Sequence, residues 1–424
     1  MAESIQSVRG VHDILPVDCE NWWQLEQLLR KIAKQYGYQE IKLPILEFAK
    51  LFVRGIGNST DIVEKEMYTF TDRSGEELAL RPEGTASCLR ASIEHDLIGR
   101  NKKQRLFYYG PMFRHEKPQQ GRYRQFYQFG VEAYGMSGIE IEAELLMINL
   151  QLWRELGIAS QVELQLNDLG TLEARGNYRT ALVDYFNRYH NQLDEDSKRR
   201  LSTNPLRILD TKDKVTREIV KGAPRLVDYL DEQSLNHFES LSKVLDELGI
   251  NFRVNYQLVR GLDYYSGVVF EWVIKDSEKS QNTLCAGGRY DKLVELVGGS
   301  PSPAIGFAIG IERLISLVGR VSKASRKPLL ALVVLEDDLL AYGLKIAFKI
   351  RSNTNLTVLM TSSGSLKSQL SKAVTNKATI ALIVGAQEYA DKMITVKYLD
   401  DDKPQEQINS DNLVIFCNTI ENLI

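Results

Sequence analysis

The chain of 424 residues is poor in the residues that hold small disulfide-bonded or zinc-bound domains together. It has four cysteines and five histidines, and no two cysteines have CxxC spacing. A disulfide framework and a zinc site are therefore not expected. The cysteines are expected to be small core residues in a reducing compartment: Cys19, Cys88, Cys285 and Cys417.

Long hydrophobic runs are also missing. The longest clean runs, such as Leu329–Leu335, have about seven residues, whereas a membrane helix needs about 20. The N-terminus does not show the charged and then apolar pattern of a secretory leader. These features predict a protein without membrane association, located in the cytoplasm.

An excess of charge of one sign is absent as well. Lys and Arg number 53 against 56 Asp and Glu, which gives a net charge of −3. Binding of nucleic acid through bulk charge is therefore not expected, although a local basic patch is still allowed. Apolar residues make up 43% of the chain and charged residues 26%, which is typical of a globular protein. Its length predicts two to three domains.

Positive charge is instead concentrated in residues 100–130, where eight Lys and Arg stand against the single acid Glu116. Aromatic residues alternate with these charges along the segment. Basic side chains attract phosphate, and aromatic rings offer faces on which bases can stack. The segment therefore indicates a nucleotide or nucleic-acid site, and the alternative is a solvated basic loop over an aromatic core.

The same segment predicts a β-hairpin, with strands at Leu106–Glu116 and Phe126–Tyr134 around a polar loop. On the second strand, side-chain alternation places Gln128 and Glu132 on one face, with Gly130 between them. The aromatic residues lie on the other face, which is expected to be the core. The polar face could then be the floor of a small-ligand site, or simply an exposed sheet face.

Several short segments combine glycine with charged or tyrosine side chains. The segment Arg81–Thr85 precedes a helix-like stretch, and Thr85 is predicted to cap that helix, whose N-terminus would also favour anionic groups. Taken singly, glycine pairs are explained by turns as well as by phosphate binding. No GxxxxGK[ST] sequence occurs, so a P-loop protein is excluded. The other segments are Val259–Gly267, Gly287–Asp291 and Gly306–Arg313.

Periodicity divides the chain into regions of different character. A helix is predicted at residues 20–36, followed by a strand at Ile41–Phe48 that Pro44 interrupts. Residues 171–250 have helical patterns and little strand pattern, which predicts a helical insertion. From Leu329 onward, apolar strands alternate with helices, which predicts a separate α/β domain with a parallel sheet.

Together, these segments resemble the class II aminoacyl-tRNA synthetases, and the match covers nearly the whole chain. Phe107–Gly135, with Arg114, resembles their motif 2. Arg260-Gly261-Leu262-Asp263-Tyr264-Tyr265 and Gly287-Gly288-Arg289-Tyr290-Asp291 are similar to two signatures peculiar to the histidyl enzymes. The remaining resemblances are Ile41–Phe52 to motif 1, Gly306–Leu314 to motif 3, and Arg9–Pro16 and Asn204–Asp210 to further histidyl-enzyme segments.

The resemblance implies an α+β catalytic domain with a mainly antiparallel sheet flanked by helices, a helical insertion and a C-terminal α/β domain. Motif 1 normally builds a two-fold interface, so a homodimer is expected. The expected divisions are 1–170 for the first part of the catalytic domain, 171–250 for the insertion, 251–325 for the second catalytic part and 326–424 for an anticodon-binding domain.

The implied activity is that of a histidine–tRNA ligase. Histidine and ATP would form histidyl-adenylate and pyrophosphate, and histidine would then pass to the 3′ end of tRNA(His). Mg²⁺ would accompany the phosphates of ATP. The arginine that matches Arg260 is thought to serve where related enzymes place a metal ion. The catalytic, ATP-binding residues would be Arg114, Arg260 and Arg313, with Gly310 also at the ATP site.

The resemblance also implies how the other ligands bind. Glu132 and Tyr265 would hold the two ring nitrogens of histidine. The full histidine-binding set would be Glu83, Thr85, Gln128, Glu132, Tyr264, Tyr265 and Tyr290. The loop residues Gln119, Gln120, Arg122 and Arg124 would contact the acceptor end of tRNA. Two alternatives remain: a synthetase-like regulatory subunit that binds histidine without charging tRNA, and a non-catalytic RNA-binding module.

Overall fold

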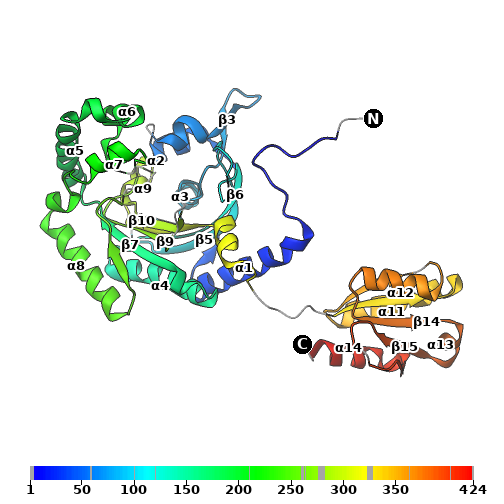
Figure 1. The fold of residues 1–424 in the computed structure, drawn as a ribbon. Coiled ribbons are helices and arrows are strands. Elements are labelled where there is room, and N and C mark those ends of the chain that lie inside the picture. Colours follow the sequence, from blue (N-terminus) through cyan, green and yellow to red (C-terminus); the bar gives the residue numbers. More distant parts are fainter. Residues whose placement is uncertain are drawn as a thin grey trace. The chain divides into compact units, whose positions relative to one another are not determined.

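The computed structural model divides into two compact units, Met1–Ser322 and Lys323–Ile424 (Figure 1). Each unit has its own sheet and its own hydrophobic core. This confirms the expected fold, in which a large sheet flanked by helices is joined to a separate C-terminal domain. The residues described are 4–57, 60–99, 101–119, 121–209, 211–258, 262, 264–275, 282–321, 328–361, 363–401 and 403–422.

An eight-stranded sheet forms the centre of the first unit, with strand order β1-β5-β6-β11-β10-β9-β7-β8. The six inner strands are antiparallel to one another, whereas the short edge strands β1 and β8 pair in parallel with β5 and β7. The strands are β1 (Gln39–Glu40), β5 (Gln104–Phe113), β6 (Gln125–Tyr134), β7 (Val162–Asp168), β8 (Phe252–Val254), β9 (Val268–Ile274), β10 (Thr283–Arg289) and β11 (Ala304–Gly310).

The predicted hairpin is present as β5 and β6, which pair from Gln104↔Tyr134 to Phe113↔Gln125. The predicted alternation along β6 is confirmed, because Phe129 and Val131 belong to one hydrophobic core while Glu132 lies on the opposite face. That opposite face is not an open surface. A second core covers it, and Glu132 has no exposed area.

Helices cover both faces of the sheet (Figure 1). Helices α1 (Pro16–Gln35), α4 (Ile139–Glu155) and α8 (Glu232–Glu247) pack on the aromatic side of the hairpin. Helix α1 begins earlier than predicted because Pro16 suits the first helical turn. The opposite face carries α2 (Ala49–Ile56), α3 (Thr85–Glu94) and α9 (Asp291–Leu296), and α10 (Ile311–Val318) follows β11.

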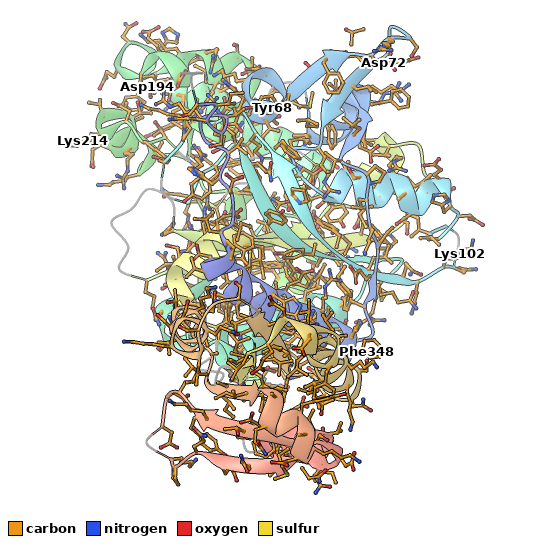
Figure 2. All side chains as sticks on the ribbon, turned by 90° about the vertical axis from the view of Figure 1, so that its right-hand side faces the viewer. Tyr68, Asp72, Lys102, Asp194, Lys214 and Phe348 are labelled. Atoms are coloured by element: carbon orange, nitrogen blue, oxygen red, sulfur yellow. The ribbon has the colours of Figure 1, made fainter. Side chains whose placement is uncertain are left out.

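The single strand predicted at Ile41–Phe48 is wrong. The chain forms β1 at Gln39–Glu40 and β2 only at Leu46–Phe48, and the two strands belong to different sheets. Pro44 lies in the gap, where it has no N–H to give to a ladder. Strand β2 joins β4 (Glu77–Leu80) and β3 (Tyr68–Thr71) in a small antiparallel sheet. Figure 2 labels Tyr68 at the start of β3 and Asp72 just beyond its end.

Residues 171–250, predicted to be a helical insertion, contain helices and no strand in their described part. The sequence starts each helix with a polar side chain that accepts a hydrogen bond from a free backbone N–H of the first turn. Thr171, Asp194, Asp213 and Asp231 do so at 2.8–3.2 Å. Figure 2 marks Asp194 and Lys214 in this region. The helices are α5 (Leu172–Asn187), α6 (Glu195–Thr203), α7 (Lys214–Val220) and α8.

The C-terminal unit has a five-stranded sheet in the order β13-β12-β14-β15-β16. The first three strands are parallel, as predicted, and β15 and β16, which were not predicted, pair antiparallel. The strands are β12 (Leu329–Val334), β13 (Thr357–Thr361), β14 (Ile380–Val384), β15 (Met393–Tyr398) and β16 (Glu406–Asn409). The helices are α11 (Leu340–Asn353), α12 (Leu366–Thr375), α13 (Ala386–Asp391) and α14 (Leu413–Asn422).

Cys88, Cys285 and Cys417 are buried, whereas Cys19 is exposed and is not the core residue expected. In the described part of the chain, no helix combines the length and the apolar character needed to cross a membrane.

The packing around Tyr108 predicts a strong penalty at Gly130. Tyr108 is buried between Gly84 and Gly130, and a Cβ atom at position 130 would overlap its ring. We expect Gly130→Ala to lower the free energy of unfolding of the first unit by about 1–3 kcal/mol or more, as overpacking does. Urea denaturation followed by tryptophan fluorescence measures this change.

Gly176→Ala is the matched control, because Gly176 lies in helix α5 with no atom within 4 Å of an added Cβ. There the same substitution should be neutral or stabilise by about 0.5–1 kcal/mol. Equal unfolding midpoints for the two variants would contradict the packing described for Tyr108.

Candidate active site

A pocket of about 280 Å³ lies on the polar face of the large sheet. Its walls come from the hairpin, the start of α3, the tyrosine-containing segment before β9, and the β11–α10 junction. Segments from both sides of the helical insertion therefore meet in one cavity. Its lining includes Glu83, Thr85, Arg114, Glu116, Arg122, Gln128, Tyr264, Tyr265, Glu271, Gly310, Glu312 and Arg313.

Small residues make the floor of the pocket flat. Ala308 on β11 pairs with Ala286 on β10, and both line the pocket, whereas their neighbour Gly130 on β6 is covered by the ring of Tyr108. The next row pairs Gln128 with Gly310. A row of residues without long side chains lets a ligand lie directly on the sheet, and the polar groups then stand at its edges.

Gln128 has an acceptor available to a ligand. Its side-chain oxygen Oε1 is buried, and it finds no hydrogen-bond partner within the described ranges. A buried polar atom without a partner is costly, unless a ligand supplies the missing donor. Because this oxygen belongs to a residue that lines the pocket, a ligand ammonium group is a suitable donor.

Glu83 holds the start of α3. Its carboxylate accepts hydrogen bonds from the N–H groups of Thr85 (2.6 Å) and Ala86 (2.9 Å). The prediction that Thr85 caps this helix is wrong, since Gly84 is the N-cap residue and Thr85 is the first helical residue. The Thr85 hydroxyl therefore does not cap the helix, and it donates a hydrogen bond to Glu132 instead. Burial raises the pKa of Glu83, and the backbone hydrogen bonds oppose this rise.

Glu132 lies directly behind the lining rather than on it. The Thr85 hydroxyl donates to its Oε1 at 2.8 Å and Tyr108 donates to the same oxygen at 3.3 Å. Tyr290 donates to Oε2. Burial raises the pKa of Glu132 to about 8, although these hydroxyl donors act in the opposite direction. One hydroxyl group, that of Thr85, therefore connects this carboxyl group to the pocket.

The predicted tyrosines come together in space. Tyr264 and Tyr265 line the pocket, with ring centroids 4.7 Å apart. Tyr290 lies behind them, 5.6 Å from the ring of Tyr264, and it does not reach the lining itself. The three rings thus form a wall that ends at Glu132.

The arginines of the lining come from the hairpin and from α10. Arg114 donates to the carbonyl of Pro82 (2.8 Å), and its guanidinium lies over the ring of Phe126 at 5.2 Å. Arg313 donates to the carbonyls of Gly121 (3.1 Å) and Thr283 (2.8 Å). Burial lowers the pKa of Arg313, and the neighbouring arginine charges add to this effect. Such a field favours an anionic ligand.

The loop between β5 and β6 brings part of the predicted tRNA-binding set to the pocket. Arg122 lines it and forms an ion pair with the buried Glu116. Gln119 is exposed and pairs with Arg122 through the backbone at the tip of the loop. Arg124 is half-buried, and its backbone N–H donates to the Gly10 carbonyl at 2.7 Å. Arg260 and Gln120 lie outside the described residues.

Sequence reasoning missed several lining residues. Glu116 was noted only as the one acid of a basic segment, yet it holds Arg122 and lies 3.8 Å from Arg114. Strand alternation could have found Glu271, because it pairs with Ala286 in the row that forms the floor. The part of Tyr108 in holding Glu132 could not be found in this way, since it depends on the hairpin register.

The acidic groups of the site do not form a metal cage. In the described part of the chain, no three His, Cys, Asp or Glu residues gather as metal ligands. Single lining carboxylates such as Glu116 and Glu271 suit an ion that is held mainly by substrate phosphates, as Mg²⁺ commonly is.

Comparisons with known proteins agree with this geometry. A family model described as histidyl-tRNA synthetase matches residues 10–314, and one described as an anticodon binding domain matches residues 329–419. The crystal structure of apo histidyl-tRNA synthetase from S. aureus is 34% identical, with a TM-score of 0.81 over 97% of this chain and 99% of that one.

Two more distant structures share the fold. A histidyl-tRNA synthetase from Nostoc is 18% identical over 99% of this chain and 100% of that one, with a TM-score of 0.68. A Bacillus halodurans protein is titled an ATP phosphoribosyltransferase regulatory subunit/histidyl-tRNA synthetase. It is 21% identical over 91% of this chain and 99% of that one, with a TM-score of 0.63. On the two domain matches and the S. aureus relative, the chain belongs to the histidyl-tRNA synthetase family.

Proposed function

We propose that the protein is a histidine–tRNA ligase that works as a cytoplasmic homodimer. It activates histidine with ATP and then transfers it to tRNA(His). The observation that carries this proposal is that one pocket brings together two chemically different sets of side chains. Carboxyl, amide and tyrosine groups line it together with Arg114, Arg122 and Arg313, which matches an amino acid lying beside a polyphosphate.

For the first set, the proposed roles follow from the available acceptors. The histidine ammonium group binds to Glu83 and to the unpartnered oxygen of Gln128. Thr85 lies between these groups and Glu132. The imidazole ring enters beside Tyr264 and Tyr265, and its N–H replaces the Thr85 hydroxyl on Glu132. Tyr265 then addresses the other ring nitrogen.

In the second set, Arg114 and Arg313 bind the phosphates of ATP, and Arg260 completes the set. The histidine carboxylate attacks the α-phosphorus, the bond to the β-phosphate oxygen breaks, and pyrophosphate leaves. Negative charge grows on the phosphoryl oxygens during this step, so fixed guanidinium groups stabilise it most in the transition state. Glu116 and Glu271 would help to hold Mg²⁺ on the outer phosphates, where it would supply further charge neutralisation.

For the second step, the loop around Gln119, Arg122 and Arg124 is proposed to contact the acceptor end of tRNA, together with Gln120. The C-terminal unit is proposed to contact the anticodon. On helix α12, Lys367 and Lys372 line one groove with serine and threonine side chains, a surface that can accept phosphate groups.

The regulatory-subunit alternative is less consistent with these observations. A subunit that only binds histidine has no need for Arg114 and Arg313 in the pocket, or for an anticodon-binding domain. The Bacillus halodurans structure whose title includes a regulatory role is similar at a level that supports a common fold only.

Histidine-dependent exchange between ATP and pyrophosphate tests the proposal, together with charging of tRNA(His). Wild-type protein should perform both reactions. Arg260→His should keep the fold and histidine binding but lose about 10²–10³-fold of the exchange rate, as for the loss of one transition-state donor. Histidine binding by the wild type without exchange would support the regulatory alternative.

Glu132→Gln tests how the ring is read. The variant keeps the shape but loses the charge that accepts from the imidazole N–H. The loss of a charged, buried hydrogen bond costs about 1.5–3 kcal/mol, so histidine affinity should fall about 10- to 150-fold. ATP affinity should stay the same. Separate titrations of the two ligands measure this, and an equal loss for both would rule out the ring-reading role.

The raised pKa of Glu132 predicts a pH dependence of histidine binding. With a pKa of about 8, the carboxyl group of the free protein is mostly protonated at pH 7. Binding of a neutral imidazole N–H requires the carboxylate, so binding releases a proton and affinity rises with pH. Between pH 7 and 8 we expect a rise of about fivefold in the wild type. Calorimetry at both pH values should find no such rise in Glu132→Gln.

Removal of residues 327–424 should leave a folded first unit, because each unit has its own core. Exchange of pyrophosphate should survive, since the described residues that line the pocket all belong to the first unit. Charging of tRNA(His) should fall sharply. Unchanged charging by the truncated protein would show that the anticodon role of the C-terminal unit is wrong.

A further inference from the structure

We propose that Arg289 is a positioning residue for the histidine site, and that His237 couples the helical insertion to it through Glu142. This inference rests on the proposed function, because it concerns the binding of histidine. None of these three side chains lines the pocket.

The Arg289 side chain is held from several directions. It is 7% exposed, and its Nε donates to Glu142 near the start of α4. Its Nη2 donates to the carbonyls of Ser137 (2.8 Å) and Gly138 (3.1 Å), just before that helix. A planar guanidinium with this many fixed acceptors has one position available. Helix α4 therefore fixes the end of strand β10.

The backbone of Arg289 passes this fixed position on to the tyrosine wall. Its carbonyl accepts from the N–H of Ser266 at 2.9 Å, directly after Tyr264 and Tyr265. The next residue, Tyr290, donates its hydroxyl to Glu132. A shift of Arg289 would thus move both the lining tyrosines and the hydroxyl that holds the ring-reading carboxyl group.

Glu142 also has a partner from the insertion. His237 on α8 places Nε2 at 2.9 Å from both oxygens of Glu142. Glu142 is 1% exposed, so water cannot readily replace a lost partner. One buried carboxylate is therefore shared between the insertion and the strand that carries Tyr290.

A second contact joins the insertion to the same segment. Arg175 on α5, the first helix of the insertion, donates to the carbonyl of Tyr265 at 2.6 Å. His237 belongs to α8, the last helix of the insertion. Both ends of the insertion therefore reach residues 264–266, one directly and one through Glu142 and Arg289.

Several titratable groups surround the cluster. Glu142 raises the pKa of His237 by accepting its hydrogen bond. Burial raises the pKa of Asp168, at the end of β7, to about 6, and the charge of Glu142 adds to this rise. Asp291 lies 4.0 Å from Arg289. Loss of His237 removes a donor and a partial positive charge from the insertion side, which leaves Arg289 as the main partner of Glu142.

His237→Leu tests the coupling, with His190→Leu as the matched control, because His190 is an exposed histidine of the insertion outside this cluster. In His237→Leu the dissociation constant of histidine, measured by calorimetry, should rise about 5- to 20-fold, the range of one charged hydrogen bond acting indirectly. The ATP constant should stay within about twofold. The control should change neither constant.

His237→Gln retains an N–H donor for Glu142, so it should recover most of the histidine affinity that His237→Leu loses. A purely structural role of His237 would not require this recovery. Glu142→Gln combined with His237→Leu should lose less than the sum of the single effects. An unchanged histidine constant in His237→Leu, or an equal loss for histidine and ATP, would overturn the proposal. Because calorimetry needs no turnover, a wild type that binds histidine but lacks exchange would overturn the ligase function alone.

Discussion

The site depends on how one buried carboxyl group is satisfied. Glu132 has no exposed area, and three hydroxyl groups from three other elements donate to it: Thr85 at the start of α3, Tyr108 on β5 and Tyr290 after β10. An unsatisfied carboxylate at this depth would cost several kcal/mol. The hairpin, the helix and the β10–α9 junction must therefore keep their mutual positions for the fold to be stable, and these positions also shape the pocket.

Glycine makes this arrangement possible. Tyr108 fits because Gly84 and Gly130 have no Cβ on either side of its ring. A Cβ at Gly306 would overlap the carboxylate of Glu132 itself. These glycines are needed for close approach rather than for unusual backbone angles. Single glycine pairs in the sequence are weak evidence of function. Here the ring of Tyr108 and the carboxylate of Glu132, which pack against these glycines, show why glycine is needed.

Local sequence patterns predicted the secondary structure better than they predicted the packing of the site. Alternation along residues 126–134 was enough to put Gln128 and Glu132 on one face, since strand periodicity is a local property. It could not show that a second core buries Glu132. The strand predicted through Pro44 was wrong because one missing N–H outweighs a favourable apolar pattern. The antiparallel strands β15 and β16 were missed because strand direction depends on pairing between distant segments.

The pairs that join distant segments were beyond sequence reasoning. His237 and Glu142 are 95 residues apart, and Arg289 and Glu142 are 147 apart. Arg289 was visible only as part of a glycine-rich signature, and neither its partner nor its direction could be read from that segment. The resemblance supplied roles for the pocket residues, whereas the side chains behind them became apparent only from packing.

Both sets of side chains have internal partners without a ligand. Glu116 pairs with Arg122 beside Arg114, and the Thr85 hydroxyl occupies Glu132. A ligand that reaches Glu132 or the arginines must therefore replace an internal partner there, and only a group that makes a stronger interaction can do so. Under the proposed function, a triphosphate meets this condition at the arginines, and an imidazole N–H meets it at Glu132. An amino acid with an apolar side chain cannot donate a hydrogen bond to Glu132, so Thr85 would remain its partner and the ligand would gain no binding energy there. Under the proposed function, this internal hydrogen bond is therefore the basis of selectivity for histidine.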